Sequence, residues 1–210
     1  VDGRSIGSAN EIEDLTPLAG LSNLAELYLN SNGISNLTPL AGMANLTVLY
    51  LYTNPISDLS PLAELPHLTK LSMYENQVSD LSPLAWLTSL VELRLDTNPI
   101  SDLSPLAGLT HLTALYLCDN EISDLSPLAG LTDLTVLNLY TNAISDLTPL
   151  VGLTQLSELS LSDNRISDLS PLAGLPHLTK LDLRYNSLDL TPGSPAMRII
   201  EDLLHRGVEV

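Results

Sequence analysis

Residues 112–131 read LTALYLCDNEISDLSPLAGL, and the same pattern recurs along the chain with a period of 22 residues. Two positions mark the register of this repeat. The first is an asparagine, found at Asn10, Asn32, Asn54, Asn76, Asn98, Asn120, Asn142, Asn164 and Asn186. The second is a proline, found at Pro17, Pro39, Pro61, Pro83, Pro105, Pro127, Pro149 and Pro171. Self-similarity at a fixed period in this range is the signature of a solenoid of stacked units.

Each position of the repeat has a physical interpretation. Leu115 and Leu117 alternate with period two, which predicts a short strand with one face inward. Asn120 follows where the chain must turn, and its amide can satisfy backbone groups that stacking would bury. Ser126 before Pro127 is a start signal for a 3₁₀ or single helical turn. We therefore predict an α/β leucine-rich-repeat solenoid, a right-handed horseshoe with a parallel concave sheet and short turns on the convex side.

The asparagines of successive units are expected to form a structural ladder along the solenoid. The ladder comprises the eight asparagines of the repeat region, Asn32, Asn54, Asn76, Asn98, Asn120, Asn142, Asn164 and Asn186. Both ends of the chain depart from the repeat, as the ends of a solenoid do. We interpret residues 1–20 as a truncated N-terminal repeat or cap, 21–189 as the 22-residue repeats, and 190–210 as a C-terminal cap.

The C-terminal cap contains a predicted helix near residues 195–206. Ser194 before Pro195 is typical of a helix start, and Gly207 is typical of a helix end. The positions expected to share its apolar face are Met197, Ile200 and Leu204, with Leu203 adjoining. We expect this helix to cover the open edge of the last repeat, while a role in binding stays the alternative.

Composition limits the classes of function. The formal net charge is −17, with 25 acidic residues against 8 basic ones. This balance argues against nucleic-acid partners and anionic membranes, which are polyanionic. No apolar run reaches the roughly 18 residues of a membrane span, so no membrane insertion is expected. Cys118 is the only cysteine, so no intramolecular disulfide forms. We expect a monomeric bacterial protein, at the cell surface or secreted, with a cytoplasmic location left open.

The segment ISDLSPLAGLT, residues 122–132, closely resembles the 22-residue repeats of bacterial internalins. It also resembles the leucine-rich-repeat class named for a protein-phosphatase regulator. The resemblance extends over roughly residues 10–189. Internalins are surface proteins that bind host proteins through their concave face. The resemblance therefore implies a non-catalytic protein-binding module.

Recognition must lie in positions that vary between repeats, because the constant positions build the scaffold. The variable positions on the outward side of the strands, and just after them, hold all seven tyrosines of the chain. Tyrosine and arginine dominate binding hot spots. The predicted partner-binding residues are Tyr28, Tyr50, Tyr52, Tyr74, Arg94, Asp96, Tyr116 and Tyr140, with Glu26, Lys70 and Glu92 in a polar rim. The strand propensity of tyrosine is the competing explanation. Binding is preferred because phenylalanine and tryptophan are absent from the same positions.

A row of aspartates forms a second repeated feature. It comprises Asp14, Asp58, Asp80, Asp102, Asp124, Asp146 and Asp168, with Asn36 filling the gap. Calcium needs several carboxylates converging on one ion, whereas a row at the pitch of the solenoid spreads them apart. We expect each aspartate to bond the backbone of its own turn. Calcium binding stays the alternative.

No arrangement in the sequence indicates catalysis. The column histidines, His67, His111 and His177, are at least two repeats apart, so about 10 Å or more separates them. No nucleophile, zinc or phosphate-loop spacing is present. We predict no enzyme activity, no metal and no cofactor. Trp86 replaces a glycine of its column on the convex side, as a secondary contact or an accident of packing.

Protein binding through the concave face is thus the predicted function. Two alternatives stay open. One is a structural spacer within a larger surface protein, and the other is self-association through the concave face. A spacer would need no concentration of tyrosines on one face.

Overall fold

The computed structural model describes residues 11–210 as one curved solenoid. Within these residues eight parallel strands form one sheet in the order of the sequence. The strands are β1 (Glu26–Tyr28), β2 (Val48–Tyr50), β3 (Lys70–Ser72), β4 (Glu92–Arg94), β5 (Ala114–Tyr116), β6 (Val136–Asn138), β7 (Glu158–Ser160) and β8 (Lys180–Asp182). Each strand pairs with the next at an offset of one repeat, as Leu27 with Leu49. Residues 1–10 of the predicted N-terminal cap, including Asn10, lie outside the described residues.

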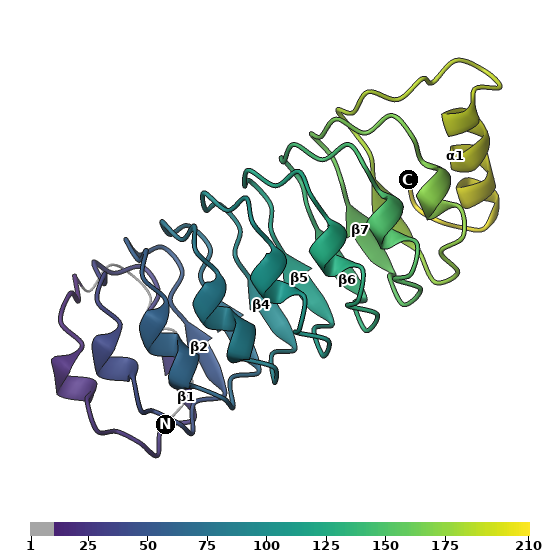
Figure 1. The fold of residues 1–210 in the computed structure, drawn as a ribbon. Coiled ribbons are helices and arrows are strands. Elements are labelled where there is room, and N and C mark those ends of the chain that lie inside the picture. Colours follow the sequence, from purple (N-terminus) through teal and green to yellow (C-terminus); the bar gives the residue numbers. More distant parts are fainter. Residues whose placement is uncertain (1–10) are drawn as a thin grey trace.

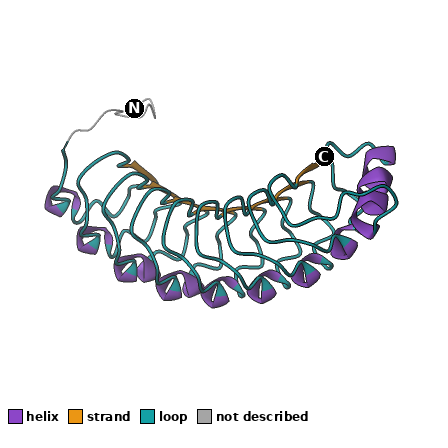
Figure 2. Ribbon diagram, turned by 90° about the horizontal axis from the view of Figure 1, so that it is seen from above, coloured by secondary structure: helices purple, strands orange, loops and turns teal. Residues whose placement is uncertain are grey.

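Short 3₁₀ turns alternate with the strands. They are η1 (Thr16–Leu18), η2 (Thr38–Leu40), η3 (Ser60–Glu64), η4 (Ser82–Trp86), η5 (Ser104–Leu106), η6 (Ser126–Leu128), η7 (Thr148–Leu150) and η8 (Ser170–Leu172). The strands line the inside of the curve and the 3₁₀ turns line the outside (Figures 1 and 2). The predicted leucine-rich-repeat solenoid with a concave parallel sheet is confirmed.

The core is a single column of aliphatic side chains that extends along the solenoid. Leu115 and Leu117 have no exposed surface, and the same holds for most of their counterparts in the other repeats. A single repeat does not bury its own leucines. Each repeat packs its leucines against those of the repeats before and after it. Stability therefore comes from stacking between neighbours.

Each ladder asparagine ties two consecutive repeats together. The Asn54 Nδ2 donates to the Leu51 carbonyl of its own turn at 2.9 Å and to the Leu29 carbonyl of the preceding repeat at 3.0 Å. Its Oδ1 accepts the Ile34 amide at 3.1 Å. The same three kinds of bond recur from Asn76 to Asn186. The side chains thus bond backbone groups of two turns rather than one another.

The residue before each asparagine adopts a left-handed conformation without being glycine. Thr53 has a φ of 56° and Asp119 a φ of 54°. Such a conformation costs roughly 1–2 kcal/mol for an L-residue. The backbone bond that it permits offsets this cost, since the Thr53 amide donates to the Tyr74 carbonyl at 2.8 Å. The interstrand ladder thereby extends beyond the three residues of each strand.

The aspartate row organises the 3₁₀ turns. The Asp124 Oδ1 accepts the Ser126 amide at 2.8 Å, and the other aspartates of the row make the same bond. Asn36 replaces them with its own Oδ1, which accepts the Thr38 amide at 2.9 Å. The turn η6 begins at Ser126 and holds the proline in its first positions, as predicted. The carboxylate two residues earlier takes the turn amide, which is the role expected for the aspartate row.

The C-terminal helix α1 spans Pro195–His205. The Ser194 side chain caps it by accepting the Met197 amide at 3.2 Å. Its most buried residues are Ala196 and Leu203, with Ile199 and Ile200 partly buried. Of the predicted face, Ile200 and the adjoining Leu203 pack toward the core and Met197 is partly buried, but Leu204 does not pack there. Leu204 is exposed, because the helix is rotated to place positions 196, 199, 200 and 203 against the last repeat.

Two further contacts fasten the C-terminal segment to the solenoid. Glu209 forms an isolated parallel bridge with Lys180, which extends the sheet beyond β8. Arg206 donates to the carbonyls of Ala173 and Leu175 in the loop that follows η8. Neither contact was expected from the sequence, because both depend on where the helix directs the chain.

Candidate protein-binding face

Four tyrosines form a continuous aromatic surface on the concave side of β1–β3. We define the tyrosine patch as Tyr28, Tyr50, Tyr52 and Tyr74. The rings of Tyr28 and Tyr50 meet edge to face, with centroids 5.1 Å apart. Those of Tyr52 and Tyr74 are stacked at 4.3 Å. Tyr50 and Tyr52 join the two pairs at 6.5 Å, so four predicted residues lie in one connected set.

The patch is held in place by its own contacts. All four side chains are half-buried, since each ring covers its neighbour. The Tyr28 hydroxyl donates to Glu26 at 2.8 Å, and this bond, together with burial, raises the pKa of Tyr28. Burial also raises the pKa of Tyr74, with smaller contributions in the same direction from Tyr52 and Glu75. These two phenols therefore stay neutral through the physiological range.

The patch borders a group of charged side chains at the centre of the face. The Arg94 Nε donates to Glu92 Oε1 at 2.8 Å, and the Lys70 Nζ lies 3.5 Å from Glu92 Oε2. The guanidinium carbon of Arg94 lies 4.3 Å from the centre of the Tyr116 ring. We define the arginine cluster as Lys70, Glu92, Arg94 and Tyr116. The arginine cluster extends from β3 across β4 to Tyr116 on β5, so it continues the surface of the tyrosine patch along the sheet.

Asp96 and Cys118 lie beside the arginine cluster. The Asp96 Oδ1 accepts the Cys118 amide at 3.0 Å, so this predicted residue bonds backbone within the face. Burial, and then the neighbouring carboxylates, raise the pKa of the Cys118 thiol to about 12. The thiol is therefore protonated at neutral pH and is a poor nucleophile.

The concave side of β6–β8 is hollowed instead of filled. Two adjoining depressions of about 340 and 280 Å³ share Asn138, Ser160, Asp182 and Arg184 in their lining. Small and polar side chains stand here where β1–β3 carry rings. Tyr140, a predicted binding residue, is exposed at the rim of one depression and has no ring contact with the tyrosine patch among the described residues.

An ion pair that the sequence analysis missed lies in the lining of this hollow. The Arg184 Nε and Nη2 donate to the two carboxylate oxygens of Asp182 at 2.9 and 2.6 Å. The Ser162 hydroxyl donates to the same carboxylate at 3.0 Å. These bonds, that of Arg184 first, lower the pKa of Asp182 to about 2. A signal for it existed, since an acid two residues before an arginine shares its face of a strand.

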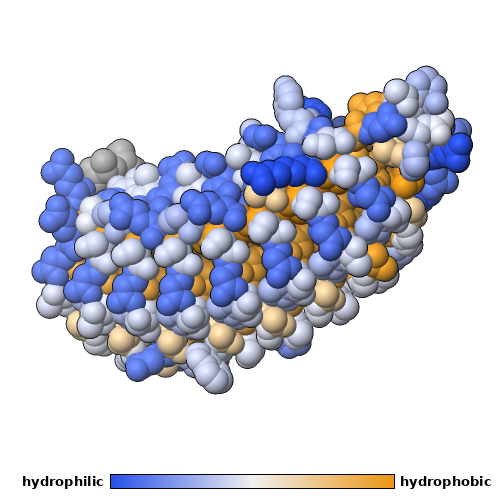
Figure 3. Space-filling model, turned by 45° about the horizontal axis from the view of Figure 1, so that its top comes forward, coloured by the Kyte–Doolittle hydropathy of each residue, from blue (hydrophilic) through white to orange (hydrophobic). Residues whose placement is uncertain are grey.

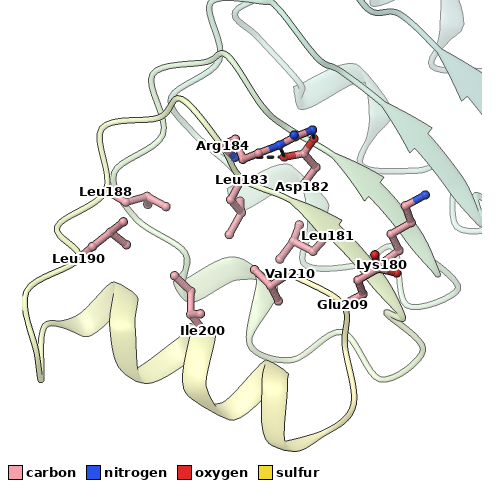
Figure 4. A pocket seen from close by; sticks show the side chains of 10 residues that line it. All are labelled: Lys180, Leu181, Asp182, Leu183, Arg184, Leu188, Leu190, Ile200, Glu209 and Val210. Carbon is pink, nitrogen blue, oxygen red and sulfur yellow. Dashed lines mark hydrogen bonds and ion pairs between the residues drawn. The ribbon is translucent and has the colours of Figure 1, made fainter.

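A more apolar hollow of about 510 Å³ lies at the C-terminal edge of the sheet and shares Lys180, Asp182 and Arg184 with the neighbouring depression. Figure 4 shows Leu183, Leu188, Leu190, Ile200 and Val210 around it, with β8 on one side and α1 on the other. The hydropathy view also shows apolar surface at this end, beyond the rows of hydrophilic side chains that follow the repeat (Figure 3). It marks where α1 and Glu209 leave part of the last repeat uncovered.

The convex side carries one large exposed aromatic residue. Trp86, at the end of η4, has 76% of its surface exposed. The turns η3 and η4 are longer than the others, because Glu64 and Trp86 replace the glycines found in the other repeats. The three column histidines are exposed on separate repeats. Within residues 11–210 no three His, Cys, Asp or Glu side chains converge as metal ligands would.

Sequence comparison agrees with this architecture. A family model described as leucine-rich repeats in two copies matches residues 22–64, 44–86, 66–108, 110–152 and 154–192. The chain therefore belongs to the leucine-rich-repeat family, as predicted. No curated protein sequence matches it.

Solved structures place the chain more narrowly, among internalin-like proteins. It is similar to an internalin (inlF) from Listeria monocytogenes, with 38% identity and a TM-score of 0.84 over 88% of this chain and 55% of that one. It is also similar to internalin C2 (inlC2) from the same species, with 40% identity and a TM-score of 0.80 over 85% of this chain and 78% of that one. This chain spans about half the length of the first. The predicted resemblance to bacterial internalin-like repeats is confirmed.

Internalin-like leucine-rich-repeat domains are typically modules of protein interaction. The only α-helix among residues 11–210 is α1, of 11 residues, and no helix there has the length and apolarity needed to cross a bilayer. Which face of this chain binds, and what it binds, are the subject of the proposal that follows.

Proposed function

We propose that this protein is a non-catalytic protein-binding module that binds its partner on the concave face, centred on the tyrosine patch. The observation that carries the proposal is the unbroken series of ring contacts from Tyr28 to Tyr74 on the outward side of the sheet. A spacer has no need for such a surface. Strand propensity accounts for single tyrosines such as Tyr116 and Tyr140, but it does not account for four rings that contact one another.

The geometry suits binding for an energetic reason. Association loses free energy for each side chain that must be ordered at the interface. The patch side chains are ordered already, because each ring packs against another. Aromatic rings also supply large apolar area with a polar tip, which suits surfaces that are exposed before binding and buried afterwards.

The net charge of the chain limits the class of protein that it can bind. The chain carries a formal charge of −17, so its long-range field attracts basic proteins and repels acidic ones. We therefore propose a protein partner of basic or mixed charge. A location at the bacterial surface or outside the cell fits this function.

A capture experiment tests the proposal. The wild-type protein and a Tyr50→Ala/Tyr52→Ala double variant are immobilised side by side, and Ser160→Ala serves as the matched control on the hollowed half. We expect the wild type and Ser160→Ala to retain the same partner and the double variant to lose it. Equal capture by all three proteins would contradict the assignment and direct attention to Trp86.

A further inference from the structure

Arg94 is a partly exposed cation of the concave face that two contacts hold in place. Glu92 holds its Nε at 2.8 Å, and the Tyr116 ring lies under its guanidinium at 4.3 Å. Lys70 balances Glu92 from the other side at 3.5 Å. The side chain is nevertheless 42% exposed. Two contacts therefore fix the plane of the guanidinium while its end faces solvent.

The free end of Arg94 has a defined hydrogen-bonding capacity. Glu92 engages only Nε, and within residues 11–210 neither Nη1 nor Nη2 donates to a protein acceptor. Their N–H groups form the outer fork of the guanidinium. A carboxylate matches this fork with two parallel hydrogen bonds, which a single carbonyl oxygen cannot do.

The charge around Arg94 favours an anion at this point. Of the eight basic residues, only Lys70 and Arg94 lie between residues 11 and 164. They flank the single carboxylate of Glu92, so the arginine cluster is locally cationic on an otherwise acidic surface. The nearby Asp96 carboxylate acts on Arg94 through its charge, but its hydrogen bond goes to the Cys118 amide and leaves the end of the guanidinium unbonded among the described residues.

We propose that the outer fork of Arg94 binds an aspartate or glutamate carboxylate of the partner protein, next to apolar partner residues that cover the tyrosine patch. This inference rests on the proposed function, since it uses the same face and the same partner. Arg94 of β4 lies opposite Ser72 of the neighbouring strand β3, and Tyr74 follows Ser72 by two residues. The outer fork and the tyrosine patch are therefore roughly 5–10 Å apart, a distance that an extended peptide spans in about two or three residues. The preferred epitope therefore has an acidic residue within about three positions of aromatic or aliphatic ones.

A random dodecapeptide display library, selected on the immobilised wild-type protein, tests this specificity. We expect the enriched peptides to carry an aspartate or glutamate at that spacing from apolar residues. Their affinity is then measured for Arg94→Gln, for Arg94→Lys and for Arg165→Gln. Arg165→Gln is the matched control, because it removes one exposed positive charge outside the concave face.

The expected effects separate fork recognition from net charge. Arg94→Gln should weaken binding at least about tenfold, because it removes a charge-assisted bidentate pair. Arg94→Lys should also weaken it by several-fold, since an ammonium keeps the charge but not the fork. Arg165→Gln should bind as the wild type does. Thermal melting of each variant checks that the fold is intact.

The outcomes distinguish this inference from the proposed function. Peptides that need Tyr50 and Tyr52, yet show no acidic enrichment and bind Arg94→Gln equally, would overturn the carboxylate site alone. Peptides that need Arg94 but bind the Tyr50→Ala/Tyr52→Ala variant equally would support the carboxylate site and contradict the tyrosine patch. A selection that enriches no binder would count against both.

Discussion

The concave surface over strands β1–β3 differs in character from the concave surface over strands β6–β8, although both rest on the same scaffold. The inward residues are alike, since Leu49 of β2 and Leu137 of β6 are both fully buried. The outward residues differ, because rings fill the face over β1–β3 while Ser160 and its neighbours leave it hollow over β6–β8. Because side chains alternate along each strand, the inward residues can keep the core constant while the outward residues vary and change the surface.

The largest expected effect concerns the shared inward side. Leu49→Ala and Leu137→Ala should each destabilise the fold by about 2–5 kcal/mol, as truncation of a buried leucine does. The two losses should be similar, because both side chains lie in the same column of the core. Chemical denaturation of the two variants measures this, and a loss confined to one region would show that the scaffold is not equivalent in both.

The asparagine ladder is the next test of equivalence. Asn54→Ala and Asn142→Ala should each cost roughly 1–3 kcal/mol, because turn amides and carbonyls lose their partners. Asn142 makes the same bonds to its own turn and to the preceding repeat as Asn54 does. Melting curves that coincide with the wild type would refute the role given to the ladder.

Acid should weaken both regions through the aspartate row. Hydrogen bonds from the following Ser or Thr hold the pKa of these carboxyls below the ordinary value of 3.8, as at Asp102 and Asp124. A depressed pKa in the folded state contributes stability that is complete above the unfolded value and is lost as the pH falls below it. We expect the melting temperature to be steady above about pH 5 and to decline below about pH 4.

The asparagine that replaces one member of the row supplies the control for this effect. Asn36 accepts the same amide but cannot titrate. Asp102→Asn should therefore change the melting temperature little at neutral pH and make the acidic decline shallower. An unchanged decline in that variant, or its absence in the wild type, would show that the row does not titrate as described.

Salt should have the smallest effect. Five of the eight basic residues lie between positions 165 and 206, so the acidic repulsion is concentrated in the preceding repeats. Sodium chloride at moderate concentration screens such repulsion, and we expect a modest rise in the melting temperature. A fall over the same range would indicate that attractive ion pairs dominate instead.

The fold was predictable because a one-dimensional signal sufficed. The period of 22 residues fixes the stacking, and the strand leucines and the asparagine fix which side faces inward. The left-handed residues before the asparagines were not predictable, since Thr53, Asp119 and Tyr185 are polar but none is a glycine, and they differ in size and charge. On α1 the assignment failed at Leu204, because the sequence of an amphipathic helix does not fix its rotation against a partner to within one position.

The composition of the concave face was predictable, but its contacts were not. Alternation along the strand places Tyr50 and Tyr52 outward, yet nothing in the sequence says that Tyr52 stacks on Tyr74. Two hydrogen bonds, from Arg94 to Glu92 and from Arg184 to Asp182, depend on side-chain rotamers that the neighbouring side chains determine. The hollow over β6–β8 needs the shape of the surrounding side chains, which a list of residue types does not contain.

The most direct test of the central claim is the affinity of a captured partner for two single variants, measured by calorimetry. Tyr52→Ala, at the junction of the tyrosine patch, should weaken binding by at least about 2 kcal/mol, as the loss of a hot-spot residue does. Ser160→Ala, in the hollowed region, should bind as the wild type does, because Ser160 lies on β7, four strands beyond the tyrosine patch. Equal affinities for Tyr52→Ala and the wild type would contradict the claim that the tyrosine patch is the binding surface.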